Sequence, residues 1–339
     1  MKLLSLAPLS ILLLGFAHAQ DPALHAGAAK VDISPLELPV LRNGGFLQAI
    51  DKRIADPLHA RSLVLHEKVS GTRVAIAIVD SCMIPRTMCD AIKKEVTAKT
   101  GIATDHILIA ATHTHSAPSS RAEGSAPQVA FGKRLADGMV EAIEKAVASL
   151  QPAQVGFGSG QVPDEVFNRR WYLQEGTMPL NPFGELDKVK MNPNRKHIVK
   201  PAGPTDPEVC IVDVRTRRKK PLGLLANYAL HYVGAINIGE RQVSADYFGE
   251  FARIMPWRLR AMSSDNFVAM LSNGPCGDVN NIDFQGKRAP RQPFEQIRIV
   301  AAKVADASWR ASKAIEQYSS DAPVAMLQRE VPLDWRKPS

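Results

Sequence analysis

The sequence is short of cysteine and, beyond its N-terminus, of long apolar runs. Its 339 residues include four cysteines, which form no CxxC pair and no zinc-finger spacing, so a disulfide-stapled mini-scaffold and a zinc finger are excluded. No later segment reaches about 18 continuous apolar residues, which predicts a soluble mature chain. Hydrophobic residues make up 45% and charged residues 22%, a balance that excludes disordered and collagen-like chains.

The sequence also has few clusters of charged residues of one sign. Lys and Arg total 42 against 34 Asp and Glu, a net charge of +8 that is scattered along the chain. The one dense basic run, RTRRKK at 215–220, lies between two apolar stretches, and we interpret it as a solvated turn between strands rather than a nucleic-acid site. We therefore expect no nucleic-acid partner and no obligate protein partner.

The N-terminus has the pattern of a secretory signal peptide. Residues 1–19 combine a positive Lys2, an apolar core and a small-x-small cleavage pattern that ends at Ala19. An uncleaved membrane anchor is the alternative. The pattern predicts a secreted or periplasmic protein, in which disulfides can form, so Cys82 and Cys89 could pair or remain buried free thiols.

Apolar periodicity predicts an α/β fold. Strands and helices alternate, which favours one layered domain over residues 20–339, with a mixed or largely parallel sheet flanked by helices. The expected strands are 27–33, 61–67, 73–80, 106–112, 153–160, 209–215, 222–230, 266–272 and 323–332, and the expected helices are 87–98, 128–150, 246–260 and 292–317.

Two regions depart from this alternation. Residues 161–208 are rich in Pro, Asn, Gly and Arg and have little periodicity, which indicates a long irregular loop of the kind that often carries function. The chain stops at Ser339, shortly after the last expected strand and without a closing element, which is the pattern of a domain truncated at its C-terminus.

The strongest chemical signal is the run ATHTHSAP at 111–118, which follows an apolar strand. Open α/β sheets place ligand sites at this end of their strands. His113 and His115 are two residues apart, so in an extended segment they point to the same side and can converge on a metal ion. Two loop histidines bonded to the backbone are the alternative.

A second apolar strand ends in His231. Two strand-end histidines together favour a zinc site, and catalytic zinc needs three protein ligands and a water. Asp278, Asp246 or Asp80 could supply the third ligand, or it lies beyond the last residue of the sequence.

A third signal is the turn-rich segment LSNGPCGDVNN at 271–281. Such a turn presents backbone N–H groups and short polar side chains to a substrate, although an ordinary tight turn has the same composition. The run SADY at 244–247 opens an expected helix, and we interpret its Ser and Asp as helix caps.

With these motifs in this order, the sequence resembles the neutral/alkaline (non-lysosomal) ceramidase family in its N-terminal catalytic region. The similarity runs over essentially the whole mature chain, and its most specific matches are the opening motif and THTHSAP. The supporting matches are AGAAKVDISP at 26–35, THTHSAP at 112–118, Asn168-Arg169-Arg170, the strand ending in His231, SADY at 244–247 and the segment 273–281.

The resemblance implies a Zn²⁺-dependent amidase that cleaves the N-acyl bond of ceramide, giving a sphingoid base and a fatty acid, and thus a role in sphingolipid metabolism. The family's two zinc-binding histidines fall on His113 and His231. His115 and Arg169 would lie beside the substrate. The family completes its zinc site with a Glu and a Tyr from further along the chain, neither of which can be placed within these residues.

The resemblance also implies catalytic roles for residues near the turn-rich segment 271–281. Zinc would polarise the acyl carbonyl, and His115 or an acid near Asp278 would carry a proton to the leaving amine. Gly277 is expected in the substrate site.

One position departs from the family pattern. Ceramidases carry a catalytic Ser in the sequence Gly-Asp-x-Ser-Pro-Asn, and here Asn280 stands in its place. An amide cannot act as a nucleophile. Three outcomes stay open: direct attack by a zinc-activated water with Asn280 stabilising the oxyanion, attack by Cys276, or a sister group that acts on another substrate or on none.

The resulting hypothesis is a zinc-dependent amidohydrolase acting on ceramide or a related N-acyl lipid, with peripheral contact to membrane surfaces. A zinc hydrolase of a soluble amide or ester and a catalytically inactive exported binding protein are the alternatives.

Overall fold

The computed structural model describes residues 23–45, 47–233, 242–262, 267–286 and 288–334. The signal peptide expected over 1–19 lies outside these residues. Within them, no helix combines the length and the apolar character needed to cross a lipid bilayer.

The fold is built from one mixed sheet of eight strands. The pairs β5–β6 and β13–β14 are parallel, and the other neighbouring pairs are antiparallel. The strands are β1 (Leu24–Asp32), β4 (His59–Glu67), β5 (Arg73–Val79), β6 (Ile107–Ala111), β7 (Gln151–Gln161), β12 (Glu208–Thr216), β13 (Pro221–Tyr228) and β14 (Val268–Asn273), in the spatial order β14-β13-β12-β7-β1-β4-β5-β6.

The sheet bends at the β1–β7 junction, where the two strands pair over two positions only, whereas β7 pairs with β12 along nine. The two halves therefore face each other across an apolar layer. In this layer Leu63 of β4 and Ile78 of β5 lie in one buried cluster with Met270 of β14.

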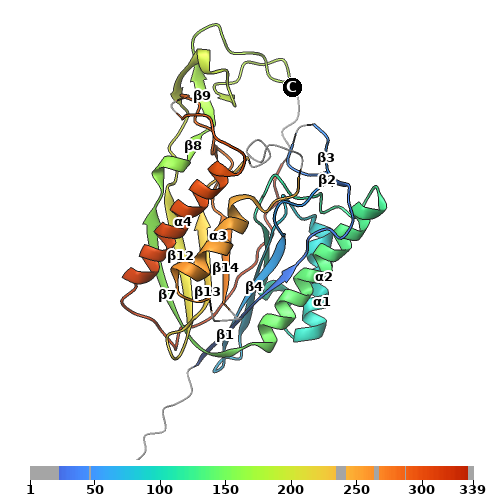
Figure 1. The fold of residues 1–339 in the computed structure, drawn as a ribbon, viewed down its shortest axis with the longest axis vertical. Helices are drawn as coiled ribbons and strands as arrows, with labels where there is room; N and C mark the ends of the chain where they lie inside the picture. The colour runs from blue at the N-terminus through green and yellow to red at the C-terminus, as the bar shows by residue number, and fades with distance from the viewer. Residues whose placement is uncertain (1–22, 46, 234–241, 263–266, 287, 335–339) are drawn as a thin grey trace, which may run out of the picture.

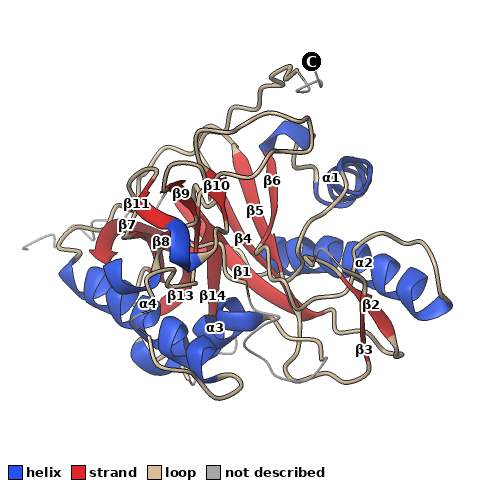
Figure 2. Cartoon of the chain, turned by 90° about the horizontal axis from the view of Figure 1, so that it is seen from above, coloured by secondary structure: helices blue, strands red, loops and turns tan. Residues whose placement is uncertain are grey.

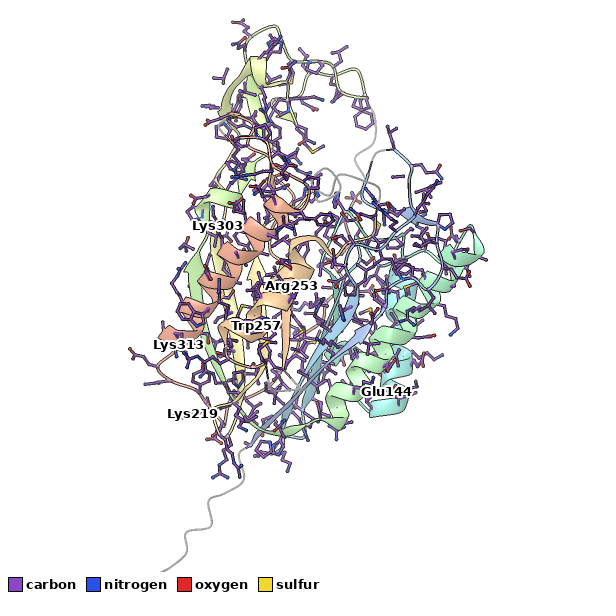
Figure 3. All side chains as sticks on the ribbon, in the orientation of Figure 1. Glu144, Lys219, Arg253, Trp257, Lys303 and Lys313 are labelled. Atoms are coloured by element: carbon purple, nitrogen blue, oxygen red, sulfur yellow. The ribbon has the colours of Figure 1, made fainter. Side chains whose placement is uncertain are left out.

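Helices cover both outer faces of the bent sheet, giving four layers (Figures 1 and 2). One pair packs beside β1, β4 and β5, and the other beside β7, β12 and β14. Arg253 and Trp257 lie along the outside of the second pair (Figure 3). The helices are α1 (Arg86–Thr100) and α2 (Ala126–Ala148) on one face, and α3 (Asp246–Arg258) and α4 (Glu295–Ala314) on the other.

The helices form where the apolar residues recur every four positions. In α2, Phe131, Leu135, Met139 and Ile143 are all at most 1% exposed, and they form the stripe that packs on the sheet. All four expected helices are thus confirmed, as is the turn between strands within 215–220, which joins β12 to β13.

The region 161–208 is not one irregular loop, as its composition predicted. It contains a small sheet with β9 in the centre, and β8 pairs with a strand from the distant 271–281 turn. These elements and the other short ones are β2 (Val40–Arg42), β3 (Ala49–Asp51), β8 (Phe167–Asn168), β9 (Arg170–Leu173), β10 (Lys190–Met191), β11 (Ile198–Pro201), β15 (Val279–Asn280) and three 3₁₀ turns at Thr104–His106, Pro163–Glu165 and Arg195–His197.

The strand predicted over 323–332 is wrong. This segment has no regular hydrogen bonding, and its apolar residues Leu327 and Val331 are 75% and 72% exposed. The chain leaves the sheet after the bridge between Val155 and Ser319 and continues to α1, where Glu330 pairs with Arg86. A short apolar run therefore occurs here without a neighbouring strand, among the described residues, to pair with.

Small residues let α2 approach β1 closely. A Cβ placed on Gly27 would overlap the carbonyl oxygen of Ala146 and lie 2.7 Å from Ser149 Oγ. By contrast, a Cβ on Gly223 in β13 would meet nothing nearer than 3.4 Å. The AGAA segment of β1 thus sets the distance between helix and sheet.

We expect Gly27→Ala to lower the free energy of unfolding by about 1–3 kcal/mol, because the helix must move away from the strand. Chemical denaturation measures this change. Gly223→Ala is the matched control in the same sheet and is expected to cost less than 1 kcal/mol on the same scale. Equal effects of the two substitutions would contradict the packing described here.

Candidate functional site

The carboxyl ends of three strands meet at one end of the fold. His113 lies two residues beyond β6 and His231 three residues beyond β13. Asn273, the last residue of β14, donates from Nδ2 to the carbonyl oxygen of Thr112 at 2.6 Å, which ties the two halves of the sheet together at this edge. The strand-end placement predicted from the sequence is therefore what the structure shows.

Three imidazole rings converge at this edge. Nε2 of His115 lies 3.3 Å from Nε2 of His113 and 3.0 Å from Nε2 of His231. The ring centroids are 4.7–5.1 Å apart. His113 has φ 64°, a left-handed conformation that is uncommon outside glycine. The structure thus brings together all three histidines that the sequence singled out.

Burial keeps two of these rings, those of His115 and His231, neutral. It lowers the pKa of His115 to about 4, with further lowering by His113 and Arg169. It lowers the pKa of His231 to about 3, with further lowering by His115, Arg169 and His113. At pH 7 both rings are therefore uncharged, and each keeps one nitrogen lone pair.

The backbone sets the orientation of two of the rings. His113 Nδ1 lies 2.6 Å from the carbonyl oxygen of Cys82, which can only accept, so Nδ1 carries the proton and Nε2 the lone pair. Gly44, at φ 94°, lies against the other ring, since a Cβ there would come 2.7 Å from His115 Cγ. Neither contact has a signal in the sequence, because both join loops that are distant along the chain.

Arg169 joins the cluster from the 161–208 region. Its Nη1 lies 3.3 Å from His231 Nδ1, and its Nε donates to the carbonyl oxygen of Gly277 at 2.9 Å. A guanidinium offers only donors, so His231 Nδ1 is the acceptor and Nε2 carries the proton toward His115. Arg169 thus places a positive charge and spare donors beside the three rings.

The cluster suits a divalent metal ion. Two nitrogens that each lie about 2.0–2.1 Å from one tetrahedral ion are about 3.3 Å apart, close to the separations of His115 Nε2 from His113 Nε2 and from His231 Nε2. The other ring nitrogen of His113 donates to a backbone carbonyl, a bond that is typical of metal-bound histidine. Coordination through His231 Nε2 requires its proton to move to Nδ1 and Arg169 to give up its contact there.

Cys82 is a further candidate ligand that the sequence did not indicate. Its Sγ and ring nitrogens of His113 and His115 lie within 4.8 Å of one another. However, burial and then the Asp246 carboxylate raise the pKa of the Cys82 thiol to about 11. The thiol is therefore protonated at pH 7 in the metal-free protein, and it must lose this proton before it can bind a metal, which weakens it as a ligand.

The acidic residues considered as a third ligand bond elsewhere. Asp80 pairs with Arg61 at 2.7 Å, and Asp246 accepts hydrogen bonds from the histidine loop itself. Asp278 is 64% exposed and pairs with Arg170 at 2.6 Å. Among the described residues, no acidic side chain joins the group with His113 and His115.

The 271–281 turn lies beside the histidine cluster, but the side chains of Asp278 and Asn280 bond to other parts of the chain. Its backbone is bonded to the arginine segment, with Arg169 N donating to the carbonyl oxygen of Asp278 at 2.7 Å. Asn280 is 1% exposed, its Oδ1 accepts from Ile282 N at 2.8 Å, and its Nδ2 faces Asn192 at 3.5 Å. The Asn280 side chain therefore bonds within the turn and to the 161–208 region. All four cysteines, including Cys276, are free thiols.

Comparison with known proteins gives a consistent result. The family model described as neutral/alkaline non-lysosomal ceramidase, N-terminal, matches residues 46–288. A neutral ceramidase of Pseudomonas aeruginosa is 30% identical over 166 residues, which cover 45% of this chain and 24% of that protein. Neutral ceramidase A of Dictyostelium discoideum is 25% identical over 235 residues, which cover 65% of this chain and 30% of that protein.

Solved structures share the fold. The crystal structure of neutral ceramidase from P. aeruginosa superposes with a TM-score of 0.68 at 20% identity, covering 88% of this chain and 46% of that one. A ceramidase complexed with C2 gives the same TM-score at 19% identity, covering 88% and 45%. The chain thus spans less than half the length of each of these relatives.

We expect Cys82→Ala to leave Zn²⁺ binding within about threefold of the unsubstituted protein, because a protonated thiol contributes little and the Cys82 carbonyl is retained. Titration calorimetry with Zn²⁺ measures this. His113→Ala provides the positive control, since it removes a ring nitrogen from the centre of the cluster. If Cys82→Ala lost as much affinity as His113→Ala, the thiol would be a ligand.

Proposed function

The chain belongs to the neutral/alkaline non-lysosomal ceramidase family, and from this premise we propose that it is a zinc-dependent amidohydrolase that cleaves the N-acyl bond of ceramide or a related N-acyl lipid. The observation that carries the proposal is the convergence of His113, His115 and His231 at the carboxyl ends of β6 and β13, with Arg169 beside them. Histidine ring nitrogens that meet at one point are a common donor set for zinc.

In the proposed site, His113 and His231 hold the Zn²⁺. When bound, zinc polarises an acyl carbonyl and makes a water a stronger nucleophile at neutral pH. Arg169 and the backbone of Gly277 bind and orient the substrate, because the guanidinium reaches past His231 with unused donors.

Proton transfer is assigned to His115. As water adds to the acyl carbon and the C–N bond breaks, one proton leaves the water and one must reach the departing amine nitrogen. His115 lies between the two proposed ligands and keeps an Nε2 lone pair at pH 7. Asp278 is less suited to this task because it is exposed and paired with Arg170.

The proposed substrate and the N-terminal sequence indicate where the protein acts. A ceramide is held in lipid assemblies, so we propose peripheral contact with membrane surfaces. The signal-like residues 1–19 support a secreted or periplasmic location.

Asn280 supports a second candidate. Its side chain is used within the turn, and an amide cannot replace a serine nucleophile. The absence of a serine nucleophile favours one of two alternatives. The first is a zinc hydrolase in which water attacks a soluble amide or ester directly. The second is a binding protein that keeps the fold but catalyses no reaction.

We expect the purified protein to release fatty acid from a short-chain ceramide dispersed in detergent, and to lose this activity on treatment with a chelator. His113→Ala and His231→Ala should lose both zinc and activity. His115→Ala should retain zinc and lose at least about 100-fold in kcat, because it removes the proton carrier. Metal analysis beside a fatty-acid assay distinguishes these cases.

Two outcomes would count against the proposal. A protein that holds zinc and cleaves a soluble N-acyl amide but not ceramide supports the second candidate. A protein that holds no zinc and cleaves neither substrate supports the binding protein.

Arg169→Ala should raise KM for the acyl substrate about tenfold or more while zinc remains bound, because its guanidinium contacts the site and holds no metal. Arg170→Ala is the matched control, since the neighbouring guanidinium pairs with Asp278 at the surface. Steady-state kinetics with both variants measures the effect. Equal KM values for the two variants would contradict a substrate-binding role for Arg169.

A further inference from the structure

Asp246 binds the loop that carries two of the histidines. Its Oδ2 accepts from Thr114 Oγ1 at 2.6 Å and from the backbone N of His115 at 3.2 Å, and its Oδ1 accepts from Ser116 Oγ at 2.8 Å. Asp246 is 1% exposed. One buried carboxylate therefore binds three consecutive residues of the histidine loop.

Backbone hydrogen bonds hold this loop at both ends. Thr112 and His113 donate their backbone N–H groups to the carbonyl oxygens of Val79 and Ser81, each at 2.9 Å. At the other end, the carbonyl oxygens of Ser116 and Ala117 accept from Ser244 N at 2.9 Å and from Asn43 N at 3.0 Å. Between these ends, the His115 N–H is bonded to the Asp246 carboxylate. Asp246 therefore supplies the acceptor for the middle of the loop.

Asp246 is itself firmly held. Asp56 accepts from Ser244 Oγ at 2.5 Å and from Ala245 N at 2.7 Å, and Ser244 Oγ accepts from Asp246 N at 3.0 Å. Asp246 has φ 51°, a left-handed conformation that costs about 1–3 kcal/mol and persists only where its surroundings enforce it. The carboxylate is therefore presented to the loop in a fixed position.

Helix capping does not explain this arrangement. The sequence predicted Asp246 as part of a helix cap, yet α3 has Ala245 at its N-cap position and no side-chain cap hydrogen bond. The Asp246 carboxylate bonds instead to Thr114 and Ser116, more than 100 residues away along the chain. The capping interpretation of this residue is corrected by these contacts.

We propose that Asp246 is the positioning residue of the site: by holding Thr114, His115 and Ser116, it directs the His113 and His115 rings toward His231. It touches neither metal nor substrate and acts through the loop. This role rests on the proposed function, since it matters for catalysis only if the three rings form the reacting centre.

The chain offers a matched control in Asp213. This carboxylate is also fully buried, and its Oδ2 accepts from Ser312 Oγ at 2.6 Å, from Tyr318 Oη at 2.9 Å and from Arg215 Nη2 at 2.9 Å. Asp213 pairs with Leu224 in the sheet, away from the carboxyl end of β13 that leads to His231. Its loss should destabilise the fold without disturbing the histidines.

The test compares Asp246→Asn with Asp213→Asn. The substituted amide turns one acceptor into a donor that faces the donors of the loop. In Asp246→Asn we expect hydrogen exchange at the His115 amide of the zinc-free protein to accelerate at least about tenfold, and Zn²⁺ affinity to fall about 10–100-fold. In Asp213→Asn both should match the unsubstituted protein, whereas the midpoint of thermal unfolding should fall in both variants.

Should Asp246→Asn fail to fold, Thr114→Val and Ser116→Ala remove the loop's donors one at a time and should each show a smaller effect of the same kind. Unchanged exchange and unchanged Zn²⁺ affinity in the Asp246 or loop variants would overturn the proposal, and so would equal losses in Asp213→Asn. If the unsubstituted protein binds no zinc, the proposed function fails, and the exchange at His115 still decides whether Asp246 positions the loop.

Discussion

The site depends on the contact between the two halves of one bent sheet. β6 lies at one end of the strand order and β13 near the other, so pairing between neighbouring strands cannot bring their ends together. Packing of β14 on β4 and β5 does so, through side chains such as Leu63 and Met270 that are fully buried. Burying one such side chain stabilises a fold by about 1.5–3 kcal/mol. The free energy that closes the sandwich therefore also aligns His113 with His231.

Around that contact, the site combines uncharged rings with the positive charge of Arg169. Burial lowers the pKa of His115 and His231 well below 7, so each of these two rings is uncharged at pH 7 and keeps one nitrogen lone pair. Arg169 supplies positive charge on one side, and the Asp246 carboxylate holds the loop from behind. The Thr114 and Ser116 hydroxyl groups and the His115 N–H are bonded to the Asp246 carboxylate, which restricts the directions in which the loop's rings can point.

Sequence patterns failed where the outcome depended on a partner far along the chain. Residues 323–332 contain a short apolar run of the kind that strands have, but no described strand pairs with them. The 161–208 region has little periodicity because its strands are two to four residues long, too short to show one, and β8 pairs with the 271–281 turn. Asp246 has the sequence context of a helix cap, and only the approach of the histidine loop makes its carboxylate an acceptor for Thr114 instead.

The order of residues alone was enough to identify the four helices, the α/β class, the strand-end histidines and the family. Each of these depends on local periodicity or on short motifs, which report how one segment buries its own side chains. Tertiary structure decided which atoms meet: the Cys82 carbonyl at His113, Arg169 at His231 and Asp246 at His115. Those contacts join residues 31, 62 and 131 positions apart, and their geometry depends on how far the sheet bends and on which loops that bend brings together.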